Sequence, residues 1–377
     1  MNKSVVFSAL SLLSLQVFAD QNHQSGIPSP AISHAPISVM GDHLHKAGEW
    51  MVSYRYMDMK MEGLLSGDDS IPLDDVLNDY MMAPKKMDMK MHMLGMMYAP
   101  TDDVTLMLMV NYLDNEMDSV MRMHMPAMDG GIEHGAGDGM SDGMSDMHGD
   151  MHDHMDESMN HMMTMDTAFS TSSSGLGDTR VSALINAFNE EHYRSHFTVG
   201  VSIPTGDIDQ KDSTPMNPNA VLGYRMQLGS GSYHLFGAFT FVYDKHDWQF
   251  GTQFNYETAL EYNDEDYRKG DKILWQNWLA YSVTHNVSVS ARLALTNQEE
   301  TDGADPRLNP MMMPTADPMM TGYNQLDGAI GVNYVFTQGA LKGHRIALEY
   351  ITPIDQDVDG IQMETDSTLV AGWQYAF

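Results

Sequence analysis

The feature that most constrains this chain is a two-residue alternation of apolar and other side chains, which runs through segments of about ten residues. In one segment the residues on the apolar face are Val104, Leu106, Leu108, Val110 and Tyr112. Residues 287–295 and 368–377 alternate in the same way. A period of two indicates β-strands with two unlike faces, and about ten residues suit a tilted membrane crossing, whereas soluble strands average about five or six. The sequence therefore predicts membrane-crossing strands.

Aromatic residues near the ends of these segments support the same interpretation, because membrane barrels carry aromatic girdles at both interfaces. These residues are Trp50, Tyr54, Tyr56, Tyr98, Tyr112, Trp248, Trp275 and Trp278. The chain ends on Phe377, as in the C-terminal signal read by the outer-membrane assembly machinery. Hydrocarbon offers no hydrogen bonds to backbone groups, so such strands must close on themselves. We predict an all-β, transmembrane, antiparallel up-and-down barrel in the bacterial outer membrane, with membrane lipid and the assembly machinery as partners.

Loop lengths predict the number of strands. Short connections are expected at 100–103, 189–192, 244–247, 284–286 and 337–343, and long external loops at 62–86, 126–165, 205–231, 262–271, 299–322 and 355–363. With both termini in the periplasm, six external loops and five turns require twelve strands. The strand-like run 221–228 would make the number odd, so we assign it to the third external loop, folded inward.

The beginning of the chain predicts export. A basic start, an apolar run of about a dozen residues and small residues at Val17 and Ala19, with cleavage expected after Ala19, are typical of a secretory signal peptide over 1–19. The run is too short for a membrane helix, which needs about 20 residues. We expect a periplasmic N-terminal segment over 20–47 and the barrel over 48–377.

Composition limits the chemistry that is available. Acidic residues outnumber basic ones by 52 to 20, which argues against a nucleic-acid partner and fits a surface that attracts cations. The sequence has no cysteine, so thiolate metal sites are excluded.

Methionines share one face of three neighbouring predicted strands. Because the opposite faces carry the aromatic and aliphatic residues expected to contact lipid, this face should line the lumen. The lumen-lining residues predicted here are Met57, Met59, Met61, Met89, Met91, Met93, Met107 and Met109, together with Arg55. Thioether sulfur is a soft ligand suited to Cu(I), but methionine is also an adaptable filler of apolar surface. The pattern leaves both metal contact and packing open.

The external loop at 126–163 has an unusual composition. From Met121 to Met165 the chain holds thirteen methionines and six histidines among Asp and Gly. The candidate metal ligands are Met147, His148, Met151, His152, His154, Met155, His161 and Met162. Imidazole suits Cu(II) and thioether suits Cu(I), so the mixture favours bound copper over zinc. A solvated low-complexity loop is the alternative.

Other candidates carry less weight. Asp42, His43 and His45 stand just before the barrel and could bind a metal, although a structural role is favoured. Arg55 and Arg180 are expected to pair with acidic lumen residues. Gly175, Gly177 and Asp178 predict a kink in a strand of the wall.

Several short motifs resemble, in their order, a family of outer-membrane barrels named after the meta-pathway of phenol degradation. The resemblance starts at His34–Trp50 and Ser53–Met57, continues through Gly175–Asp178, Ser202–Gly206 and Tyr224–Gly231, and includes Asn263–Asp264 and Tyr267–Gly270. It implies a transporter-like barrel and is interrupted at the Met/His-rich loop.

Four functions follow as hypotheses. The first is an outer-membrane channel or transporter whose Met/His-rich loops bind soft metal ions, copper or silver, for tolerance or uptake. The second is a passive importer of small hydrophobic or aromatic compounds. A metal-sequestering surface protein without a channel and an outer-membrane enzyme are the others, and no serine elbow supports the enzyme.

Overall fold

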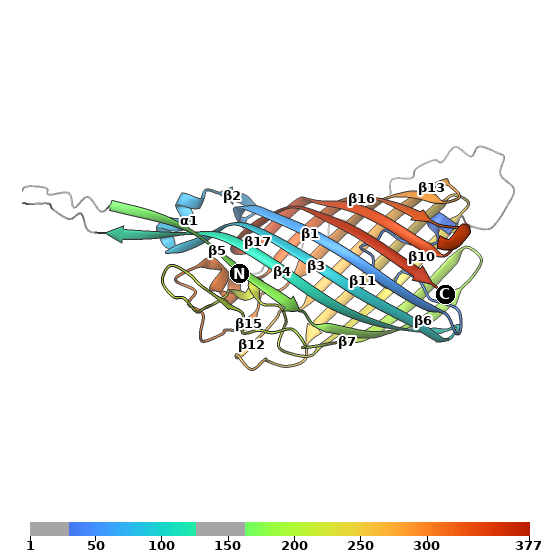
Figure 1. Ribbon diagram of the computed structural model, residues 1–377, viewed down its shortest axis with the longest axis horizontal. Helices are drawn as coiled ribbons and strands as arrows, with labels where there is room; N and C mark the ends of the chain where they lie inside the picture. Colours follow the sequence, from blue (N-terminus) through green and yellow to red (C-terminus); the bar gives the residue numbers. More distant parts are fainter. Residues whose placement is uncertain (1–29, 126–162) are drawn as a thin grey trace, which may run out of the picture.

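The computed structural model describes residues 30–125 and 163–377, which form a closed antiparallel β-barrel (Figure 1). The predicted signal peptide and most of the Met/His-rich loop lie outside the described residues. The strands of the wall are β1 (Trp50–Gly67), β3 (Met82–Thr101), β4 (Val104–Met125), β5 (Met163–Leu176), β6 (Thr179–Asn189), β7 (Tyr193–Ile203), β10 (His234–Lys245), β11 (Trp248–Ala259), β13 (Lys272–Thr284), β14 (Val287–Gln298), β16 (Tyr323–Val335) and β17 (His344–Ala376).

The wall contains twelve strand positions, which confirms the fold class and strand number predicted. β17 turns back at Gly360, whose φ is 66°, so that residues 345–358 pair with β16 and residues 358–376 pair with β1. β5 and β6 pair with successive parts of β4 and together make one position, interrupted at Gly177 and Asp178. The expected kink is therefore present. The five short connections also fall where they were predicted.

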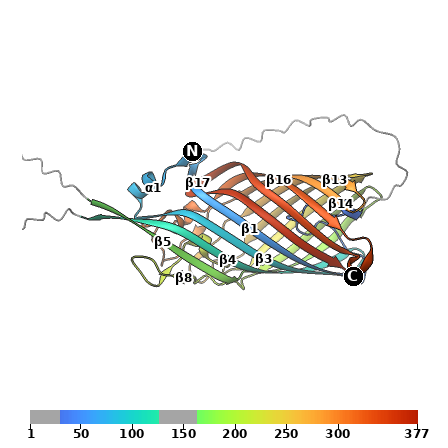
Figure 2. The ribbon, with the colours of Figure 1, turned by 45° about the horizontal axis from the view of Figure 1, so that its top comes forward.

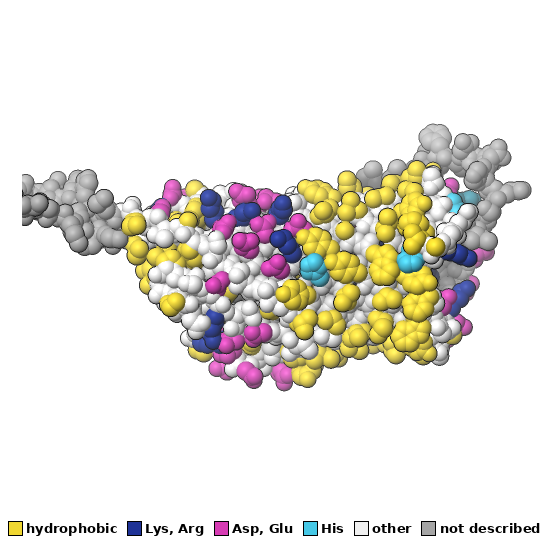
Figure 3. All heavy atoms as spheres, in the orientation of Figure 1, with side chains coloured by type: hydrophobic (Ala, Val, Ile, Leu, Met, Phe, Trp, Pro, Cys, Tyr) yellow, Lys and Arg dark blue, Asp and Glu magenta, His cyan; other side chains and the backbone are white. Residues whose placement is uncertain are grey.

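The distribution of side chains is that of a barrel in lipid. Along β14, Val289, Leu293 and Leu295 are exposed, whereas Ser288 and Arg292 are buried on the other face. The wall as a whole has an apolar outer surface and an interior rich in Gln, Ser, Thr and Asn. On the face drawn in Figure 3, hydrophobic side chains form a yellow band across one end of the barrel. Water would penalise this outer surface, whereas hydrocarbon does not.

The wall is uneven in height. β1, β3 and β4 have 18, 20 and 22 residues, whereas β6 and β7 have 11 each. Charged residues cover the projecting outer surface beyond the yellow band, where Asp58 lies opposite Lys90 and Lys60 opposite Asp88 (Figures 1 and 3). This change from apolar to charged residues marks the outer boundary of the membrane.

Short elements lie at the outer end of the barrel, where Figure 2 labels α1 and β8. They are β2 (Asp69–Ile71), α1 (Leu73–Asp79), β8 (Lys211–Asp212), β9 (Ala220–Val221), β12 (Tyr267–Arg268), β15 (Asp302–Gly303), and the 3-10 turns η2 (Tyr224–Met226), η3 (Pro314–Ala316) and η4 (Pro318–Met320), while η5 (Gly339–Leu341) lies between β16 and β17. No helix in the described part of the chain is long and apolar enough to cross a membrane.

The sequence predicts a periplasmic N-terminal segment over 20–47, but most of its described part lies inside the barrel. From η1 (Pro30–Ile32) to His45 the chain lies inside the wall strands, whereas residues 46–48 are exposed, and we call residues 30–45 the N-terminal plug. Ala35 and Val39 pack against Val242 and Trp278, while Ile37 packs against Ala347 and Val370. Packing against these residues of the inner wall removes the apolar side chains of the segment from water.

Trp278, expected in the aromatic girdle, instead points inward. It is buried at 1% exposure, and its Nε1 donates to Gln249 Oε1 at 2.9 Å. The indole lies on Gly251 of the neighbouring strand, where a Cβ atom would overlap the ring. Glycine is therefore required at this position by close packing.

We predict that Gly251→Ala lowers the free energy of unfolding by about 1–3 kcal/mol, because the added methyl group overpacks the site beneath Trp278. Chemical unfolding in detergent, followed by the heat-dependent gel mobility of the barrel, measures the effect. The control is Gly237→Ala on the adjacent strand β10, where a Cβ would meet Thr198 O at an ordinary 3.6 Å. Equal losses in the two variants would contradict the packing explanation.

Candidate functional site

The methionines of β1, β3 and β4 lie on adjacent strands in direct register. Met57, Met59 and Met61 stand opposite Met91, Met89 and Met87, and Met51 stands opposite Met97. On the next strand, Met117 is opposite Met87, and Met107 is opposite Met97. Directly opposed residues have Cβ atoms about 4.5–5.5 Å apart. We call this set, with Met93, Met109 and Met121, the methionine ladder.

Burial places the ladder on the inner face of the wall. Its members are buried or half-buried, whereas Leu94 and Met96 between them are 61% and 41% exposed. Arg55 shares this face and is buried. The structure thus brings together, on one inner wall, the residues that the sequence predicts as lumen-lining.

The outer end of the ladder is covered by an inward loop, which we define as residues 204–233. Its residues Leu222 and Met226 pack against Met61, Met87 and Met117 of the wall. The run 221–228 that looks strand-like in the sequence therefore folds into the lumen. In the external loop 299–322, Met313 joins this cluster, whereas Met311 and Met319 are 76% and 62% exposed.

Asp178 ties both ends of the inward loop to the kink in the wall. Its Oδ1 accepts Gly206 N at 3.0 Å, and its Oδ2 accepts Ser230 N at 2.9 Å and Ser230 Oγ at 2.7 Å. Gly206 and Gly229 touch so closely that neither has room for a side chain. Sequence reasoning assigned Asp178 only to the kink. The succession of short glycine motifs was the available signal that these segments meet.

The N-terminal plug is held at its backbone by side chains from distant strands. Ser288 Oγ donates to Ala31 O at 2.7 Å, and Gln253 Nε2 donates to Met40 O at 2.9 Å. Glu349 accepts Ser38 N at 2.9 Å and the Nε of the buried Arg292 at 2.7 Å. Sequence reasoning did not identify Glu349, because nothing local indicates which segment its carboxylate meets.

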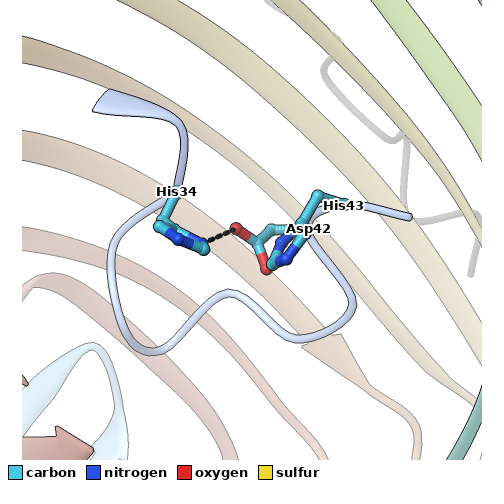
Figure 4. A group of neighbouring side chains, drawn as sticks. All are labelled: His34, Asp42 and His43. Atoms are coloured by element: carbon cyan, nitrogen blue, oxygen red, sulfur yellow. Dashed lines mark hydrogen bonds and ion pairs between the residues drawn. The ribbon is translucent and has the colours of Figure 1, made fainter. Parts of the chain in front are cut away.

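Three side chains of the plug converge on one point (Figure 4). His43 Nδ1 lies 2.9 Å from Asp42 Oδ1, and His34 Nδ1 lies 4.0 Å from Asp42 Oδ2. One ligand atom from each residue falls within 4.8 Å of the others. His45 stands beside them, with its ring 4.8 Å from that of His43. The sequence singled out Asp42, His43 and His45, but missed His34, which lies eight residues before Asp42.

The imidazoles of His34 and His45 are held neutral by a lowered pKa. Burial, with a smaller contribution from Arg345, lowers the pKa of His34, and burial lowers the pKa of His45 to about 4. Neutral imidazole keeps a lone pair for hydrogen bonding or for metal coordination.

A cavity of about 190 Å³ lies between the plug and the inner faces of strands β4, β6, β7, β10, β11 and β13. Met107, Met109 and Met40 border it on one side, and Phe236 and Leu274 on another. Arg180 at its edge pairs with Glu257 at 2.7 Å, as expected for a lumen arginine. Arg55 differs, because its buried Nε has no hydrogen-bond partner among the described residues.

The predicted metal ligands of the Met/His-rich loop, from Met147 to Met162, lie outside the described residues. Their role stays a prediction.

We predict that Glu349→Ala destabilises the barrel by about 3–5 kcal/mol, because Arg292 would remain buried without its counter-charge and the plug would lose the acceptor for Ser38 N. Glu349→Gln retains a hydrogen-bond acceptor and should lose less. Unfolding midpoints of the two variants test this order. A Gln variant as unstable as the Ala variant would contradict the role given to the hydrogen bonds.

Comparison with known proteins supports the fold and the family resemblance. The family model "Putative MetA-pathway of phenol degradation" matches residues 149–311, which confirms the resemblance seen in the sequence. No curated protein matches the sequence.

The chain is also similar to solved structures. An outer membrane channel from Pseudomonas putida F1 has a TM-score of 0.54 at 14% identity, over 89% of this chain and 98% of that chain. A Pseudomonas aeruginosa FadL homologue has a TM-score of 0.36 at 10% identity, over 87% and 89%. The similarity to the P. putida channel establishes a shared barrel fold. With its apolar outer surface, the chain is a bacterial outer-membrane barrel, as predicted.

Proposed function

We propose that this protein is an outer-membrane channel or transporter that carries soft metal ions, copper or silver, for uptake or tolerance. The observation that carries the proposal is the methionine ladder, which continues across three strands from the projecting wall to the plug. Thioether sulfur binds Cu(I) in preference to hard cations. The Met/His-rich segment 126–163 is the proposed capture element at the outer mouth.

The surroundings of the ladder favour a role beyond packing. Elsewhere the inner wall carries many polar residues, among them Gln249, Gln253 and Gln276 on β11 and β13. The buried methionines of the wall lie on β1, β3 and β4 and, at Met363, on the adjacent β17, although an even apolar lining would be expected for simple filling. Met91 and Met93, in the middle of the ladder, are only half-buried. Ions could pass between neighbouring thioethers, each binding weakly enough to release them.

The charge of the protein supports the entry of cations. The excess of acidic over basic residues, 52 to 20, gives a field that concentrates positive ions near the surface.

A second candidate, import of small hydrophobic or aromatic compounds, is supported by the lumen cavity. Its volume of about 190 Å³ exceeds that of an engineered cavity of about 150 Å³ that binds benzene. Phe236 and Leu274 give it apolar walls. The description of the matching family points in the same direction.

Replacing Met57, Met59, Met89 and Met91 together by Leu separates the two candidates. Leucine keeps the volume and apolar character but removes the sulfur. We expect uptake of Ag(I) or Cu(I) into barrel-containing vesicles to fall at least tenfold, while passage of a small aromatic solute changes less than twofold.

The matched control is Met96→Leu, because Met96 lies on the same strand with its side chain exposed on the outer face. It should leave metal uptake unchanged. Unaltered metal uptake in the fourfold variant would refute the metal proposal, and a parallel loss of aromatic passage would favour the second candidate.

A further inference from the structure

The inner end of the methionine ladder meets the histidines of the plug. Asp42 borders the same small cavity as Met51, Met97, Met107 and Met109. Met40, two residues before Asp42, borders the larger cavity together with Met107 and Met109. An ion that leaves the last thioethers therefore reaches the carboxylate of Asp42 and the imidazoles beside it.

We propose that His34, Asp42 and His43 form a binding site for a singly charged soft ion, Cu(I) or Ag(I), at the periplasmic end of the ladder. This inference rests on the proposed function and deepens it by naming the site to which the ladder delivers. Each of the three residues supplies one ligand atom, and His45 stands next to His43 as a further imidazole.

One ligand atom of the site has no hydrogen bond. His34 Nδ1 is buried and has no hydrogen-bond partner among the described residues, and Asp42 Oδ2 is 4.0 Å away. His45 Nε2 is also buried without a partner. A buried nitrogen without a hydrogen bond costs about 1–3 kcal/mol. A metal ion would supply the missing interaction.

The backbone around the site is held in place before any ion arrives. Ala35 N donates to Asp42 Oδ2 at 2.9 Å, and His196 Nε2 is hydrogen-bonded to Gly41 O at 2.8 Å. Gly41 has a φ of 58°, which favours glycine and turns the chain back so that Asp42 faces His34. Such preorganisation reduces the entropy lost on binding.

Charge and spacing favour a monovalent ion over zinc. The guanidinium groups of Arg55 and Arg345 are buried and interact electrostatically with Asp42. One carboxylate already faces two positive charges, so an ion of charge two would be repelled more than an ion of charge one. Tetrahedral zinc ligands lie roughly 3.3 Å apart, whereas His34 Nδ1 and Asp42 Oδ2 are 4.0 Å apart. That wider separation suits an ion held by two ligands on opposite sides.

The test measures Cu(I) and Ag(I) bound by the purified full-length protein in detergent, with a chromophoric chelator as competitor. We expect the double variant His34→Ala, His43→Ala to bind one metal ion fewer per protein molecule than the unmodified protein, and we call this ion the plug-bound equivalent. X-ray absorption at the metal edge should show a matching loss of nitrogen scattering. The control His92→Ala should lose nothing, because His92 lies on the outer surface of β3, hydrogen-bonded to Tyr54 at 2.7 Å.

Asp42→Asn provides a second variant should the double alanine variant fail to fold, since the amide oxygen can still accept Ala35 N. It should lower the affinity of the site for Cu(I) and Ag(I) at least tenfold. Zn(II) should bind equally to the unmodified protein and to the histidine variants. Unchanged Cu(I) and Ag(I) binding in the histidine variants would overturn the site, and equal losses of zinc would overturn its selectivity.

The fourfold ladder variant keeps failure of the site distinct from failure of the proposed function. It should retain the plug-bound equivalent, because the sulfur atoms removed are not its ligands. If metal transport proves absent while this equivalent persists, the site stands without the channel. If transport occurs and the histidine variants bind as the unmodified protein does, the site is wrong and the channel stands.

Discussion

The structure depends on one constraint, which is that every backbone amide and carbonyl facing hydrocarbon must have a partner within the chain. Pairing of β17 with both β16 and β1 satisfies it by closing the sheet. Contact with lipid also reverses the usual arrangement of side chains, because apolar residues are needed on the outer face. The lumen is therefore free to hold groups that a water-soluble core would not tolerate, such as the buried pair of Arg292 and Glu349.

Much of this fold could be predicted from sequence because it follows from local repetition. Val289, Leu293 and Leu295 lie on the lipid side as their spacing requires, and the turns fall at the predicted breaks in alternation. Trp278 shows that residue type alone can predict the wrong face of a strand. Its residue type suits the girdle, but its position in the alternation places it inside, where Gly251 leaves room for the ring. Periodicity was the better guide.

The candidate site was predictable only in part, because its residues belong to segments that periodicity does not position. The methionines of the wall could be assigned to one face, since their strands are regular. The plug has no regular repeat, and its location depends on contacts such as that of Glu349 with Ser38, 311 residues apart in the chain. His34 is next to Asp42 only because the intervening chain turns at Gly41. No local sequence pattern predicts that these residues lie close together.

The contacts of the plug also bear on how the barrel is assembled. The plug precedes β1 in the chain, yet Ser288 of β14, Glu349 of β17 and Arg345, which donates to Ala35 O, belong to strands that come late. The seam between β1 and β17 joins the first and the last strands of the wall. The plug therefore lacks these hydrogen-bond partners until the last strands have folded. The insertion of the plug and the pairing of β1 with β17 should then be a single late event in folding.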